Sequence, residues 1–224
     1  MSDTNTNQLH KEFELERMIL FSDAVFAIAI TLLIIEIKFP EIHDVAHTDI
    51  TLLFKPVLLE ASGFLVSFIF IGMAWVSHLK LFRFLRAYND GIIFRNLLML
   101  FFVVTFPFSA SSLTHYKPNF PLPILIYFAN VTLVFIANFL LAHYMLKRKP
   151  SLTLPGNDAE QIFIYRRSKA LALAFPLAFI IVLLTVIFSH NDDESIRMGF
   201  YGAIAVMVLV NLWIKRQKPR SLKT

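Results

Sequence analysis

The hydrophobic residues of this chain form six long runs separated by shorter polar segments. The runs cover residues 18–39, 57–79, 92–113, 122–145, 170–188 and 198–214. Each is close to the roughly 20 apolar residues that a helix needs to cross the hydrocarbon core of a bilayer. The pattern therefore predicts an all-α membrane protein with six transmembrane helices.

The polar segments between the runs are too short to form a second domain. Residues 1–15 are a polar N-terminal tail, and residues 215–224 are a basic C-terminal tail. A Pro-Gly-Asn turn signal within residues 151–161 separates four runs from two. We expect residues 1–224 to form a single six-span domain, with kinks at Pro107 and Pro176 inside the third and fifth runs.

The basic residues predict the orientation in the membrane. Most of the 21 lysine and arginine residues lie in the two tails and in the connections after the second and fourth runs. Connections rich in these residues stay in the cytoplasm, so both termini should be cytoplasmic. The net charge of +5 then reflects topology and contact with anionic lipid headgroups, and no nucleic-acid partner is expected.

Composition narrows the class of protein further. Hydrophobic residues make up 57% of the chain, charged residues 17%, and the mean hydropathy is +0.64. The absence of cysteine excludes disulfides, thiolate metal sites and a cysteine nucleophile. Because no GxSxG, HExxH or P-loop pattern occurs, we expect neither an enzyme nor a protein with a cofactor or bound catalytic metal.

The first run differs from the others because an ionisable residue lies inside it. Ser22 and Asp23 both fall within residues 18–39. A charged side chain at membrane depth costs about 3 kcal/mol or more, and residues kept there at such a cost are usually functional. We therefore expect the function of the chain to depend on an unbroken helix formed by this run.

A helical projection of the first run places four residues in one stripe. At about 100° per residue, Ala24, Ile28, Thr31 and Ile35 share a face, and Leu32 lies at its edge. Steps of four, three and four residues match the a/d seam of helices gathered around a common axis. Ordinary helix packing would produce the same spacing, so the stripe alone does not identify a pore.

Asp23 lies about 110° from the middle of this stripe, so we expect its partner to come from another helix. Arg17 is six residues away, which is not an i,i+3 or i,i+4 spacing. His78, at the end of the second run, is the preferred candidate. Trp75 lies on the same face as His78 and offers an indole N–H donor.

Two residues at the start of the third run, Arg95 and Asn96, are alternative partners for Asp23. We interpret Ser22, Asp23 and their partners as an anchor that fixes the first helix. A polar cluster at the level of the headgroups, with no specific role, is the other interpretation of the same residues.

Residues 17–23 match a known motif. Arg17-Met-Ile-Leu-Phe21-Ser22-Asp23 fits the pattern RxxxFSD of the transmembrane protein 175 family, the endosomal and lysosomal potassium channels and their prokaryotic relatives. The six runs and the Trp75-x-x-His78 pair also resemble that family, in its prokaryotic form with one six-span repeat. The resemblance implies a homotetramer in a prokaryotic plasma membrane, with the first helix of each copy around a central pore.

The same resemblance implies roles for individual residues. Ile28 would form the hydrophobic constriction, Thr31 would contribute to selectivity, and Ile35 would add a second apolar layer, with Leu32 beside them. Residues of the motif and of the next two helices would hold the first helix in register; they are Arg17, Phe21, Ser22, Asp23, Trp75, His78 and Asn96. The expected partners are further copies of the chain, membrane lipids and potassium ions.

A pore of this kind would lack a carbonyl filter, because the chain contains no TVGYG-like segment. A ring of Ile28 side chains would instead gate by dewetting, and Thr31 hydroxyls could hold a partly hydrated potassium ion. We expect a modest preference for potassium. Two other functions remain open at this point: a proton-coupled secondary transporter with Asp23 as the titrating group, and a non-conducting membrane scaffold.

Overall fold

The computed structural model describes residues 2–37, 50–113, 121–155, 158–188 and 193–218. The polar segment 38–49, with the end of the first hydrophobic run, lies outside the described residues. The helices are α1 (Ser2–Leu32), α2 (Ile50–Phe82), α3 (Asp90–Val104), α4 (Phe106–Ser112), α5 (Leu122–His143), α6 (Asp158–Phe188) and α7 (Asp193–Arg216). Short 3-10 or π turns follow α1 and α5; they are η1 (Leu33–Glu36), η3 (Tyr144–Arg148) and η4 (Pro150–Leu152). The fold is all-helical over the described ranges, as predicted.

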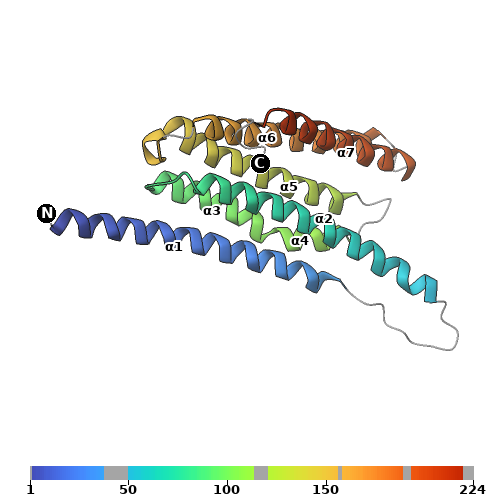
Figure 1. Cartoon of the computed structure of the whole chain (residues 1–224). Helices are drawn as coiled ribbons and strands as arrows, with labels where there is room; N and C mark the ends of the chain where they lie inside the picture. Colours follow the sequence, from blue (N-terminus) through green and yellow to red (C-terminus); the bar gives the residue numbers. More distant parts are fainter. Residues whose placement is uncertain (1, 38–49, 114–120, 156–157, 189–192, 219–224) are drawn as a thin grey trace.

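The long helices lie side by side along one direction and alternate in polarity (Figure 1). α1 lies at one edge of the bundle, where it packs against α2, α3 and α4, and α7 lies at the opposite edge, mainly on α6. Five stretches of described residues are long and apolar enough to cross a membrane: Glu12–Ile35, Glu60–Phe82, Asp90–Ser112, Leu122–Arg148 and Asp158–Phe188. The sixth hydrophobic run lies within α7, which has 24 residues.

The third hydrophobic run is broken into two helices. α3 ends at Val104, Thr105 lies between them, and α4 begins at Phe106. Pro107 has no N–H to donate to the preceding turn, and its ring crowds the carbonyl four residues earlier. The kink expected at Pro107 is therefore a helix break. Pro176, in contrast, lies inside the continuous helix α6.

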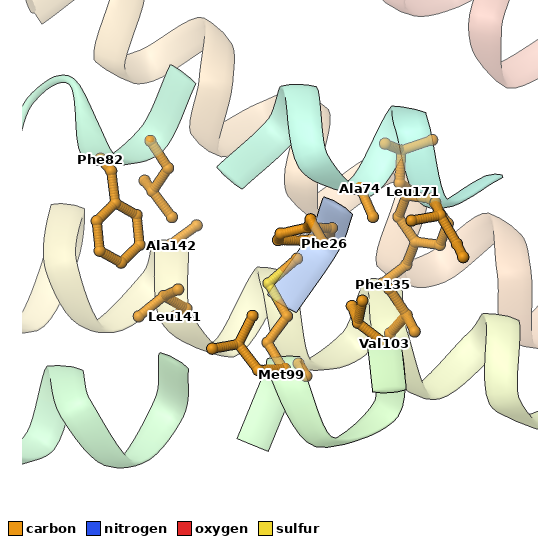
Figure 2. Close-up of a cluster of buried hydrophobic side chains, with 14 of the residues drawn as sticks. Phe26, Ala74, Phe82, Met99, Val103, Phe135, Leu141, Ala142 and Leu171 are labelled. Atoms are coloured by element: carbon orange, nitrogen blue, oxygen red, sulfur yellow. The ribbon is translucent and has the colours of Figure 1, made fainter. Parts of the chain in front are cut away.

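Phe26 fixes α1 to the hydrophobic core. Its side chain is buried among residues of the neighbouring helices, including Ala74 of α2 and Met99 and Val103 of α3 (Figure 2). Deeper in the bundle, Phe135 of α5 stacks on a phenylalanine of α6 with ring centres 4.0 Å apart. Because lipid tails are as apolar as this core, the attachment comes from the close packing of Phe26 against its neighbours.

Candidate functional site: the free face of α1 and its anchor

α1 has two sides of different character. From Ser22 onward, the buried residues are Ser22, Phe26 and Ala29 of α1 and Leu33 at the start of η1. Their spacing of four, three and four residues turns one side of the helix toward α2, α3 and α4. At about 100° per residue, the opposite side is the stripe of Ala24, Ile28, Thr31 and Ile35. All four stripe residues are exposed.

The stripe is strongly exposed at its two large apolar residues. Ile28 is 59% exposed and Ile35 is 67% exposed, and Leu32 at the edge is also exposed. The Thr31 hydroxyl lies on the same side and donates a hydrogen bond of 2.9 Å to the Ile28 carbonyl. This bond uses the hydroxyl proton and leaves the oxygen lone pairs on the exposed side of the helix.

The first helix is not a continuous α-helix over its whole length, which differs from the prediction from the sequence. The α-helix ends at Leu32 and continues as a 3-10 turn through Glu36. A 3-10 helix advances about 120° per residue, so the wheel angle expected for Ile35 does not apply. Ile35 is nevertheless exposed, but its side chain leaves the helix axis at a different angle from the one that a regular α-helix predicts.

Below the stripe, a buried chain of hydrogen bonds ties α1 to two neighbours. Asn96 of α3 is central: its Nδ2 donates to Ser22 Oγ at 2.9 Å, and its Oδ1 is 2.9 Å from His78 Nε2 of α2. Ser22 Oγ in turn donates to the Met18 carbonyl at 2.9 Å. All three linked side chains are at most 1% exposed. The bonds fix the rotation of α1, because turning the helix would leave buried polar atoms unpaired.

The partner of Asp23 is Trp75, which corrects the preference for His78. Trp75 Nε1 donates to Asp23 Oδ1 at 2.9 Å. His78 instead bonds Asn96, and its ring stacks on Phe82 with centres 4.0 Å apart. The His78 ring packs between the aromatic rings of Phe26 and Phe82, and its Nε2 bonds Asn96 of α3 instead of Asp23.

The other two alternatives for Asp23 lie elsewhere. Asn96 forms the buried hydrogen bonds to Ser22 and His78 described above. Arg95 donates to the Gly91 carbonyl at 2.8 Å, and its guanidinium carbon lies 4.0 Å from the centre of the Tyr144 ring. Arg95 therefore stabilises the start of α3 against the end of α5 rather than the carboxylate of α1.

Arg17 and Phe21, the first two fixed positions of the RxxxFSD motif, face outward. Arg17 is exposed, and its guanidinium carbon lies 5.9 Å from the centre of the Phe13 ring on the same helix. Phe21 is exposed as well. Within the part of the chain that the structure describes, neither side chain joins the buried bonds of Ser22. The structure thus brings Ser22, Asp23, Trp75, His78 and Asn96 together and leaves Arg17 and Phe21 on the surface.

One contact of α1 was not foreseen from the sequence. The Tyr88 hydroxyl, in the connection between α2 and α3, donates a hydrogen bond to Glu14 Oε2. This bond to the Glu14 carboxylate raises the pKa of Tyr88, so the phenol keeps its proton, and its role as donor, at neutral pH. A tyrosine in a short polar connection carries no signal in the sequence that would identify such a partner.

Comparisons with known proteins agree with this geometry. The family described as endosomal/lysosomal potassium channel TMEM175 matches residues 17–107, which contain the motif and the whole anchor. A crystal structure of a lysosomal potassium-selective channel TMEM175 homolog from Chamaesiphon minutus superposes with a TM-score of 0.69 and 26% identity, over 88% of this chain and 98% of that one. The chain resembles the TMEM175 family in sequence over residues 17–107 and in fold over most of its length.

Bacterial potassium channels are similar to this chain over nearly half of its length. A potassium channel of Chamaesiphon minutus is 37% identical over 108 residues, which are 47% of this chain and 52% of that protein. A potassium channel of Streptomyces collinus is 36% identical over 96 residues, or 43% and 46% of the two chains. The matched part thus spans about half the length of these relatives.

The arrangement in this chain combines a rigid attachment with a free apolar face. The buried bonds and Phe26 fix one side of α1, and the stripe on the other side has no covering helix within the described residues of a single copy. A multi-pass membrane protein can cover such a face with lipid or with further copies of itself. Only the second arrangement encloses a path for ions.

Proposed function

We propose that four copies of this chain form a potassium-selective cation channel in the plasma membrane of a prokaryote, with six spans per copy and both termini in the cytoplasm. The first helix of each copy lines the central pore. The observation that carries the proposal is the stripe on the free side of α1, opposite the residues that the bundle buries. α1 also lies at the edge of the bundle, where copies can meet (Figure 1).

The composition of the stripe supports contact with other copies over contact with lipid. Ala24 and Thr31 are small, and both are exposed; Ala24 precedes Ile28, and Thr31 lies between Ile28 and Ile35. Small residues let transmembrane helices approach closely, and lipid tails give no reason to keep them. Four such helices would leave a narrow path whose walls are isoleucine side chains and threonine oxygens.

The chemistry of that path explains the proposed preference for potassium. Ile28 has no oxygen to replace the hydration shell of an ion, so a ring of four would pass ions only when wide enough to stay wet. The Thr31 oxygen lies one turn away and keeps its lone pairs free. An ion with partly retained water can rest there, and potassium releases water more readily than sodium.

The position of Asp23 favours the channel over a proton-coupled transporter. Its carboxylate accepts the indole bond of Trp75 on a side of the helix that differs from the stripe by about 110°. A residue that relays protons should lie on the path of the transported ions, whereas Asp23 joins α1 to α2. We therefore assign Asp23 to the anchor.

Purified protein in planar bilayers, with potassium on one side and sodium on the other, tests this function. We expect ohmic single-channel currents whose reversal potential shows preference for potassium. Ile28→Asn should raise the conductance or reduce that preference. Ile180→Asn is the matched control, because Ile180 of α6 is also exposed but lies far from α1 along the bundle. Absence of current, or equal effects of the two variants, would contradict the proposal.

A further inference from the structure

A large cavity lies on the side of the bundle away from the stripe. Its volume is about 760 Å³, and its walls come mainly from α2, α5, α6 and α7. From Arg167 to Ala178, the residues of α6 that line it span about 16 Å at 1.5 Å per residue. The cavity is therefore elongated along the helices, and its volume is within the range of about 300–1,000 Å³ that small-molecule sites occupy.

Most of the lining is apolar, and the two ends differ. Apolar side chains form most of the walls, among them Phe64, Phe70 and Ile204, and Glu60 and Ser62 of α2 also line the cavity. At the end of the bundle where α6 begins and α7 ends, Arg167 and Asn211 line the cavity. This end of the bundle also carries the basic connections. We call the apolar interior of the cavity the tunnel and the positively charged entrance beside Arg167 the mouth.

Arg167 is the unusual residue of this mouth. It is only partly exposed, and within the described ranges its guanidinium has neither a hydrogen bond nor an ion pair. An arginine taken out of water needs an anionic partner to offset the loss of hydration. The structure supplies no such partner from the described parts of α2, α6 or α7.

The neighbours of Arg167 increase the positive charge. Lys80 of α2 is close enough to be repelled by Arg167, by Arg83 and by Lys218. The one carboxylate that attracts Lys80 is Glu160, and it is already in a salt bridge with Arg83. Arg167 thus lines the cavity, and Lys80 with the cations that repel it adds positive charge nearby, a field that attracts an anion.

We propose that this cavity binds an anionic phospholipid from the leaflet at the basic end of the bundle. One acyl chain enters the apolar space, and the phosphate pairs with Arg167. A neutral lipid would fill the space but leave the guanidinium unpaired, and a soluble phosphate would pair with it but leave the tunnel empty. Only a molecule with both parts satisfies the two ends of the cavity.

Two pairs of variants separate the contributions of headgroup and chain. Arg167→Gln removes the charge at the mouth, and Arg166→Gln removes the same charge from the adjacent, exposed position. Gly63 lines the cavity and has open space where a side chain would begin, so Gly63→Leu fills part of the tunnel without displacing a neighbour. Gly72→Leu is its control, because Gly72 has the same open space on the same helix but does not line the cavity.

Native mass spectrometry of the full chain, purified with an equimolar mixture of phosphatidylglycerol and phosphatidylcholine, counts the retained lipids. We expect wild type, Arg166→Gln and Gly72→Leu to retain phosphatidylglycerol preferentially. Arg167→Gln should reduce that preference by about tenfold, as expected for the loss of one charge-assisted pair, with phosphatidylcholine still bound. Gly63→Leu should lower the retention of both lipids.

Several results would overturn this assignment. They are equal retention of the two lipids by wild type, an unchanged preference in Arg167→Gln, or control variants that lose lipid as strongly as their partners. Displacement of phosphatidylglycerol by excess glycerol 3-phosphate would show a site for free anions instead of a lipid. None of these measurements depends on ion conduction, so the lipid site and the channel function can fail separately.

Discussion

Asn96 offers the sharpest test of the anchor, because its amide joins three helices through one side chain. It is 1% exposed and forms two bonds of 2.9 Å, to Ser22 of α1 and His78 of α2. Interhelical hydrogen bonds in membrane proteins contribute about 0.6 kcal/mol on average and up to about 1.7 kcal/mol. Loss of both bonds in Asn96→Leu should therefore cost about 1–3 kcal/mol.

The histidine left behind adds to this cost. His78 is also 1% exposed, and without Asn96 its Nε2 has no partner within reach of the described residues. An unsatisfied buried polar group costs about 1–3 kcal/mol, so we expect Asn96→Leu to reduce the free energy of unfolding by about 2–6 kcal/mol in total. Ser22→Ala should cost less, because it removes one interhelical bond and leaves His78 paired.

Unfolding in sodium dodecyl sulfate mixed micelles, followed by tryptophan fluorescence, measures these differences. A double-mutant cycle of Ser22→Ala and Asn96→Leu should give a coupling energy of about 0.6–1.7 kcal/mol, the value of the bond between them. Leu97→Ala, at the next and exposed position of α3, is the control and should have a small effect. A cycle without coupling, or an Asn96→Leu protein as stable as wild type, would refute the anchor.

Three further predictions concern the stripe, the motif and the fold. Thr31→Val should change the permeability ratio of potassium to sodium, and an identical reversal potential in bilayers would reject a role for the hydroxyl. Trp75→Phe removes the bond between α1 and α2, and Asp23→Asn replaces its charged acceptor by a neutral one. Trp75→Phe should therefore reduce the yield of the proposed tetramer in native mass spectrometry more than Asp23→Asn, while any remaining current stays ohmic. Loss of a saturable, pH-coupled flux in Asp23→Asn alone would favour the transporter. A β-carbon at Gly199 of α7 would lie 2.9 Å or less from three atoms of Thr185 in α6. Gly199→Leu should therefore destabilise the α6–α7 contact by about 1–3 kcal/mol, measured by thermal unfolding. An unchanged midpoint temperature of unfolding would contradict that close approach.

The features that could be predicted from the sequence are those set by a single helix. The stripe of α1 depends only on spacing within one run, and the exposure of Ala24, Ile28 and Thr31 matches it. The run also predicted a helix of sufficient length, but not its end at Leu32, because the change to a 3-10 turn depends on how the chain packs beyond it.

Features that depend on two or more helices were harder to predict. The partner of Asp23 is set by the register of α2 against α1, and that register follows from the rings around His78, namely Phe26 and Phe82. No local pattern encodes the resulting preference for Trp75. The cavity is a further example, because it arises from the gap between α2 and the α6–α7 pair, and the residues around Arg167 gave no sign of it.

Cysteine substitution along α1 tests most directly whether this helix lines an ion pathway. The chain contains no cysteine, so each introduced thiol is the only one present. Ile28→Cys and Thr31→Cys place a thiol on the stripe, and Ala29→Cys places one on the buried side, where Ala29 is 1% exposed. The account predicts that a charged methanethiosulfonate reagent blocks the bilayer current of the first two variants and leaves the third unchanged. Equal modification at all three positions, or no block at the stripe, would contradict a pore lined by α1.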